Sequence, residues 1–451
     1  MRVIAASLLS LIATILGVIV LVLTWVLTTE SGLRFAVQEL HAQAPGRFTV
    51  GAVNGRLIGP LTIRNLDLKT ATSHLTADYV NFDWLPSRLF LGEVVIDRLH
   101  VRGASLTSYE TNQKSTSTPA ELLALLQPPP AIELHDIVLQ DFEYRTPGSK
   151  PFIIRHAELA AGSDSRGLHL DKLQAEGPLF AIQGHALIKP QRGHPTQGEL
   201  SWQVRPPGYP TAVGHTTLSG SLQELHIEQR IDAPYRTQAT AVVHDVLTDP
   251  HFQAEVHLNA LRLRAIRAQL PNLTIDATAH AKGRSSDIDY TAQAKIVDPA
   301  QGTFKLSLDG GLAQQIVNIH RLALVVMDTP IRMQADGRIN LASKHSALAA
   351  DWQKLRWPLQ GTPRFTSPSG RLTLSGTPDN LTARLNAAIG DKGAVIGHMR
   401  REQDNIQLAL DWHDLNWPLH QPRVSSPEGT ARLAGTLQRY TLAVDTRIDM
   451  P

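Results

Sequence analysis

Histidine is the residue type in this chain that could most readily do chemistry, because its imidazole transfers protons and binds metals near neutral pH. The chain contains 19 histidines. Most stand at polar positions of alternating segments, such as His135 in IELHDI, His169 in LHLDKL and His320 in VNIHRL. The sequence contains no H-E-x-x-H zinc motif, glycine-rich phosphate loop or G-x-S-x-G nucleophile motif. We therefore interpret the histidines as solvated strand residues, and the sequence predicts no catalytic residue, metal ligand, cofactor or enzyme activity.

A repeated tryptophan phrase is the next candidate for a site. DWQKLRWPL at 351–359 returns as DWHDLNWPL at 411–419, and Gln353 in the first copy stands where the second has His413. The phrase therefore does not depend on an imidazole. Its aromatic residues could face a ligand or anchor the packing at a turn, and the proline after each pair favours packing. These repeat anchors are Trp352, Trp357, Trp412 and Trp417.

The elements that position these residues are predicted to be strands. Apolar residues alternate with polar ones in segments such as DYTAQAKI (289–296), FKLSL (304–308) and LTARLNAAI (381–389). An octet of the form apolar-x-apolar-x-x-apolar-x-apolar overlies this alternation in nine places. They begin at residues 61, 94, 132, 152, 168, 256, 317, 350 and 410. One octet could arise by chance, but nine predict twisted strands in which a bulge absorbs the extra residue and keeps one face apolar.

The repetition extends to larger units. LSGTPDNL (374–381) and LAGTLQRY (433–440) are two versions of one strand–turn–strand junction, about sixty residues apart. This spacing matches the spacing of the tryptophan phrases. We therefore expect a repeat of about sixty residues near 348–449.

The first residues predict a membrane anchor. Val3–Leu27 contains no charge, and 25 residues at about 1.5 Å each can cross a bilayer core. A cleaved signal peptide is the alternative, but no small-x-small cleavage site follows. Arg2 before the span places the N-terminus in the cytoplasm. The predicted anchor residues are Leu8, Leu11, Ile12, Ile15, Leu16, Ile19, Leu23 and Trp25.

Composition excludes several functional classes for the rest of the chain. The 43 Lys+Arg and 41 Asp+Glu nearly cancel, which argues against a nucleic-acid-binding protein. Cysteine is absent, so disulfides and thiol chemistry are excluded. After the anchor, the pattern predicts an amphipathic helix over 29–46, with Thr29 or Ser31 as its cap. The only other predicted helix covers 118–127 and ends at a run of three prolines.

A sheet with one apolar face must have that face covered. The face could close on itself as a dry core, or it could form an open groove covered by acyl chains. The residues alone leave both possibilities open. The groove candidates are Leu61, Ile63, Val94, Ile96, Leu134, Leu170, Val256, Leu258, Leu306, Leu385, Leu442 and Val444.

The N-terminal quarter resembles the start of the TamB family, the inner-membrane part of the bacterial translocation and assembly module. The resemblance rests on TTESGLRFAVQELHAQAPGRFTVGAVNGRLIGPLTIRNLDLKT and continues through LTADYVNFDWLPSRLFLGEVVIDRLHVRGASL. The W-x-x-L-x-W-P-L phrase also resembles that family's repeat. The resemblance implies an elongated, repetitive antiparallel β-sheet curled into an apolar groove, a β-taco related to AsmA-like and bridge-type lipid-transfer proteins.

The same resemblance implies a function. The expected protein is a single-pass inner-membrane protein with most of its chain in the periplasm, moving phospholipid between the inner and outer membranes. The alternative is an envelope scaffold with a dry β core that assists outer-membrane protein assembly or secretion. Expected partners are phospholipid acyl chains, the inner membrane and an outer-membrane barrel of the Omp85 type, but no nucleic acid.

The expected organisation has four parts. An anchor covers 1–28, a short helix 29–46, a first β segment 47–188 and repeating β units 189–451. The family's C-terminal domain, which implies the contact with the barrel, is expected to be missing from this chain.

Overall fold

The computed structural model describes residues 25, 27–43, 48–109, 131–359, 362–417, 424–436 and 438–449. Most of the predicted anchor and the predicted helix over 118–127 lie outside these residues. Within the described part of the chain, no helix has the length and apolar character needed to cross a membrane.

The chain forms two compact units. The first comprises residues 1–227 with 245–249, and the second comprises 228–244 with 250–451. The first unit contains helix α2 (Glu30–Gln43) and the 3-10 helix η1 (Pro86–Leu91), and the second contains α4 (Leu263–Ile266). Strand β11 (Glu224–Ala233) contains the boundary between them.

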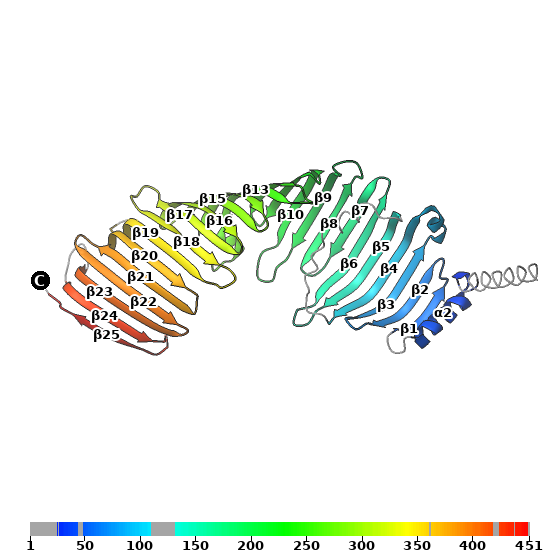
Figure 1. Ribbon diagram of the computed structural model, residues 1–451, viewed down its shortest axis with the longest axis horizontal. Helices are drawn as coiled ribbons and strands as arrows, with labels where there is room; N and C mark the ends of the chain where they lie inside the picture. The colour runs from blue at the N-terminus through cyan, green and yellow to red at the C-terminus, as the bar shows by residue number, and fades with distance from the viewer. Residues whose placement is uncertain are drawn as a thin grey trace, which may run out of the picture. The chain divides into compact units, whose positions relative to one another are not determined.

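Ten strands form the sheet of the first unit, and Figure 1 shows them side by side. Their bounds are β1 (Phe48–Gly55), β2 (Leu61–Lys69), β3 (Ser73–Trp84), β4 (Glu93–Ser108), β5 (Ala131–Arg145), β6 (Phe152–Asp164), β7 (Gly167–Glu176), β8 (Phe180–Ile188), β9 (Pro195–Val204) and β10 (Ala212–Ser221).

Fourteen strands form the sheet of the second unit. Their bounds are β12 (Arg236–His244), β13 (His251–Arg262), β14 (Thr274–Arg284), β15 (Asp287–Asp298), β16 (Gly302–Ala313), β17 (Ile316–Val326), β18 (Arg332–Asn340), β19 (Ser346–Trp357), β20 (Phe365–Gly376), β21 (Asn380–Ile389), β22 (Gly393–Glu402), β23 (Asn405–Trp417), β24 (Val424–Gly435) and β25 (Tyr440–Thr446).

The prediction of a mainly β protein is confirmed, and neither sheet is closed into a barrel. Within the sheet of each unit, consecutive strands pair in chain order, and nearly all these pairs are antiparallel. The expectation of an entirely antiparallel sheet is wrong at β4 and β5, which pair in parallel from Glu93↔Ala131 to Thr107↔Arg145. Parallel neighbours require a long crossover, and more than twenty residues separate these two strands.

The predicted bulges are present at most of the octets. The pairing register shifts by one residue within the octets that begin at 94, 132, 168, 256 and 317. In the octets beginning at 61, 350 and 410, the fifth residue instead has a positive φ: 53° at Asn65, 52° at Lys354 and 49° at Asp414. The register shift and the positive-φ residue have the same effect. Each returns the side chains after the extra residue to the face that the side chains before it occupy.

Helix α2 begins where its sequence contains a capping residue. Thr29 Oγ1 accepts a hydrogen bond from the Gly32 backbone N–H at 3.1 Å, which satisfies one of the unpaired donors of the first turn. Leu33 is 2% exposed, and the helix lies beside β1 (Figure 1). The apolar stripe of the helix is thus used to cover the first strand.

The two copies of the repeated phrase form the same hairpin contact. Trp352 Nε1 donates to Ser367 Oγ at 2.8 Å, and Trp412 Nε1 donates to Ser426 Oγ at 2.8 Å. Each of these tryptophans also pairs across the strands with a glycine, Gly370 or Gly429. The phrase recurs because each copy places a tryptophan on one strand, where it contacts a serine and a glycine of the next strand.

The remaining anchors differ from these two. Trp357 ends β19 with its side chain 56% exposed, and Trp417 ends β23. Leu359, which follows Trp357 by two residues, is buried against Val326 and Ile331. In the first copy the phrase therefore also supplies one member of a compact cluster at the end of β19.

Replacing Gly370 with alanine is expected to destabilise the second unit by about 2–3 kcal/mol, because the new Cβ would overlap the indole ring of Trp352. Gly311→Ala is the control, since the nearest atom to a Cβ there is the Ile288 carbonyl oxygen at 3.3 Å. Urea unfolding of both variants measures the difference. Equal stabilities would show that the tryptophan can move aside without cost.

Candidate functional site: a continuous apolar face

One face of the second unit carries apolar residues across all fourteen strands. Residues paired directly across neighbouring strands point to the same face of a sheet, so the pairing register defines rows. One such row, here called the second central row, contains an aliphatic residue or glycine on every strand. Its members are Ala239, Val256, Ala279, Ala292, Leu308, Leu322, Ala335, Ala350, Leu372, Leu385, Gly397, Leu410, Ala431 and Val444.

The first unit has an equivalent row across its ten strands, here called the first central row. It includes β5 although that strand runs parallel to β4, because Val101 and Leu139 are paired. Its members are Val53, Ile63, Val80, Val101, Leu139, Ala157, Ala175, Ile182, Trp202 and Gly214.

The groove candidates named from the sequence lie on these two faces. Ile63, Val256, Leu385 and Val444 belong to the central rows, and the others occupy adjacent rows on the same side. Those in adjacent rows are Leu61, Val94, Ile96, Leu134, Leu170, Leu258, Leu306 and Leu442. Their assignment to an acyl-chain site remains a prediction, since position on a face does not show what the face binds.

The apolar faces are only partly covered by the protein itself. Most of the candidates are half-buried, and Leu442 and Val444 on β25 are 57% and 54% exposed. The fully buried side chains of the described residues are few, and one small cluster joins Val326, Ile331 and Leu359. Apart from α2 beside β1, no described element therefore packs over the rows.

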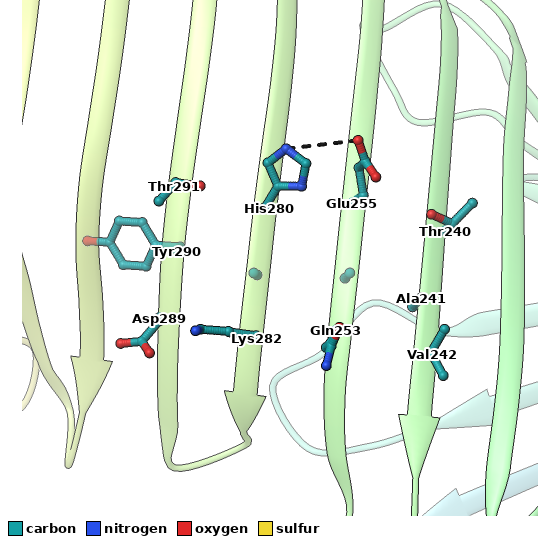
Figure 2. Close-up of a pocket in the computed structure, with 12 residues that line it drawn as sticks. Thr240, Ala241, Val242, Gln253, Glu255, His280, Lys282, Asp289, Tyr290 and Thr291 are labelled. Carbon is teal, nitrogen blue, oxygen red and sulfur yellow. Dashed lines mark ion pairs between the residues drawn. The ribbon is translucent and has the colours of Figure 1, made fainter.

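Shallow hollows occur on both faces of the sheet of the second unit. One of about 470 Å³ lies on the face opposite the second central row, where it is lined mostly by polar side chains such as Glu255, His280, Lys282 and Asp289. The row Ala241, Ala254, Ala281 and Tyr290 runs between these side chains, and Figure 2 shows how β12 to β15 bring the residues together. The Tyr290 hydroxyl donates to the Asn318 carbonyl oxygen at 3.2 Å, and burial raises the pKa of this phenol. Polar and charged side chains thus surround this hollow, and it is not part of the apolar face.

A second hollow, also of about 470 Å³, is lined almost entirely by apolar atoms. It lies against β20 to β25, where Trp412 faces Val395 and Gly429 across the strands. Its lining residues are Phe365, Ile389, Val395, Trp412, Leu415, Asn416, Val424, Ser426, Thr446 and Ile448. A hollow of this composition suits a hydrocarbon chain and offers few polar groups to any other ligand.

The opposite face of both sheets is polar. In β15, Asp287, Asp289, Thr291, Gln293 and Lys295 are exposed, and they alternate with half-buried residues. Exposed ion pairs connect neighbouring strands on this face, such as His280 Nε2 to Glu255 Oε1 at 3.9 Å (Figure 2). Pairs of this kind add little stability, so their main effect is to keep this face in water.

One polar cluster was missed in the sequence. Ligand-type atoms of Glu133, Asp164 and His169 lie within 4.8 Å of one another, and His169 is buried. Arg166 fills the cluster, because its Nη2 lies 2.9 Å from His169 Nε2 and its Nε lies 2.7 Å from Asp164 Oδ2. The cluster is therefore an ion-pair network closed by the guanidinium. Its members come from three strands, so only the register could have revealed it.

The network predicts a pH-dependent contribution to stability. Burial raises the pKa of Asp164, but hydrogen bonds from Arg166 outweigh it and hold this pKa below its ordinary value. A lowered pKa gives stability that is present above the unfolded-state pKa of about 4 and is lost as pH falls through the native pKa. Arg166→Gln should thus destabilise the chain at pH 7 and have progressively less effect as pH falls below 4. Urea unfolding at several pH values tests this, and a cost independent of pH would contradict it.

Comparisons with known proteins include a match to a family model. The family model described as "TamB, N-terminal domain" matches residues 19–400. No curated protein and no solved structure matches the chain.

Proposed function

The chain belongs to the TamB family, and on this premise we propose that its apolar faces carry the acyl chains of phospholipids moving between the inner and outer membranes. Residues 3–27 would anchor the chain in the inner membrane, and the strands would stand in the periplasm. The observation that carries the proposal is the second central row, which presents an aliphatic side chain or glycine on fourteen successive strands.

Chemical uniformity supports lipid as the ligand. A site for a sugar, nucleotide or peptide needs convergent polar groups that fix its orientation. The second central row contains none, and the hollow beside Trp412 contributes mainly apolar surface. A hydrocarbon chain needs only apolar contact, so it can occupy any position along such a row and exchange between neighbouring positions.

A scaffold that assists the assembly of outer-membrane proteins is the second candidate. One observation favours it: β25 presents the exposed side chains of Tyr440, Leu442 and Val444, which offer an apolar surface to an extended segment of another protein. A partner of the Omp85 barrel type, which the family resemblance implies, would be consistent with this role. The scaffold needs no lipid on the faces.

Mass spectrometry under native conditions separates the two candidates. The chain from Thr29 onward is purified without detergent, and bound phospholipid is counted for each chain. Several bound phospholipids per chain are expected for the conduit. A folded, lipid-free protein would contradict the conduit and favour the scaffold.

A further inference from the structure

The 3-10 helix η1 exposes an unusual group of large apolar side chains. Leu89, Phe90 and Leu91 are 47%, 93% and 67% exposed. Pro86 begins the helix, and Gly92 ends it in the left-handed conformation, with φ 76°. Consecutive side chains of this kind, set in a defined turn between β3 and β4, are costly to leave in water.

Hydrogen bonds place η1 close to the end of the predicted anchor. Trp84, two residues before η1, donates its Nε1–H to the Leu57 carbonyl oxygen at 2.8 Å. The next residue, Ile58, donates its backbone N–H to the Leu27 carbonyl oxygen at 3.0 Å. We use the name apolar rim for the exposed residues gathered here: Leu27, Leu85, Leu89, Phe90 and Leu91.

The surroundings of the apolar rim fit a membrane surface. The uncharged stretch Val3–Leu27 ends at the rim itself. Trp25 and Phe35 contact each other there with ring centroids 5.9 Å apart, and aromatic residues of this kind prefer the headgroup level of a bilayer. Arg56 is exposed beside the rim and supplies a cation for anionic headgroups, whereas Arg88 is exposed but paired with Glu93, with Nη1 3.3 Å from Oε2.

We infer that the apolar rim inserts into the interfacial layer of the membrane that holds residues 3–27. This inference rests on the proposed anchoring of that stretch. Insertion gives the first unit a second attachment besides the anchor and fixes its first strands against the bilayer. Leu61 on β2 and Phe82 on β3 are paired on the apolar face, two residues before Trp84, so an acyl chain leaving the bilayer would reach the face directly.

A single fluorescent label tests the inference. Because the chain contains no cysteine, Phe90→Cys offers one site for an environment-sensitive fluorophore. Leu179→Cys is the matched control, since Leu179 is 50% exposed in the turn between β7 and β8 of the same unit. The full chain is incorporated into vesicles of phosphatidylethanolamine and phosphatidylglycerol that contain a lipid-borne quencher.

The expected result is a blue-shifted emission at position 90 and quenching on the order of threefold stronger than at position 179. Flotation of the vesicles reports the anchoring separately. A chain that floats but shows equal quenching at the two positions would overturn the apolar rim alone. A chain that does not float would overturn both the rim and the anchoring.

Discussion

Replacing Leu385 with aspartate is expected to remove most of the phospholipid bound near β21 while leaving the chain folded. Leu385 lies in the second central row between Leu372 and Gly397, and its side chain is half-buried. A carboxylate placed in hydrocarbon costs about 3 kcal/mol, which corresponds to roughly a hundredfold lower occupancy at that position. In the free protein the same carboxylate remains in contact with water, so the cost to folding is small.

The measurement is bound phospholipid per chain, together with the far-ultraviolet circular dichroism of the same sample. Asn386→Asp is the matched control, because it adds the same charge to the next residue, which is exposed on the polar face of the same strand. The control should retain its lipid. A Leu385→Asp chain that unfolds would contradict the open face, since only a dry core makes a single charge so costly to folding.

The second prediction compares a substitution in the buried core with a substitution on the apolar face. Ile331→Ala is expected to cost about 3 kcal/mol whether or not lipid is present, because Ile331 is 0% exposed and packs against Val326 and Leu359. Leu308→Ala in the second central row should cost about 1 kcal/mol in the lipid-free chain, since the half-buried leucine leaves little cavity.

The effect of bound lipid on the cost of each substitution distinguishes Ile331 from Leu308. Phospholipid that binds the folded chain stabilises it by mass action, and Leu308→Ala weakens that binding, so its cost should rise in the lipid-loaded protein. Urea unfolding of lipid-loaded and lipid-stripped samples measures both costs. A Leu308→Ala cost as large as that of Ile331→Ala without lipid would show that the face is packed by protein.

The strands were predictable because the alternation that specifies a strand lies within a few consecutive residues. In VHLNALRL, the alternation of Val256 and Leu258, one extra residue and then Leu261 was enough to predict the bulge now seen between Leu258 and Leu261. The direction of a strand is not local. Nothing in AIELHDIVL shows whether it pairs parallel or antiparallel to β4, since both arrangements give the same alternation.

The candidate sites also contain features that the sequence predicts and features that only the structure shows. Large residues at alternating positions identified part of the apolar face, whereas the alanines and glycines that complete the rows, such as Ala279 and Gly397, give no strong signal alone. The apolar rim was overlooked although it has a readable pattern: Leu89, Phe90 and Leu91 form an apolar run between Pro86 and Gly92. Its exposure could be known only from the structure.

The order of pairing also determines how the protein can fold in time. From β12 to β25, every two strands that are consecutive in the chain pair with each other. A newly delivered strand therefore finds its partner already in place, and the sheet can grow by one hairpin after another with little loop-closure entropy. The exception is β5, which must wait for the whole segment after β4 before it can pair. Growth of the first unit should pause at that point, while the second unit can extend strand by strand as it is synthesised.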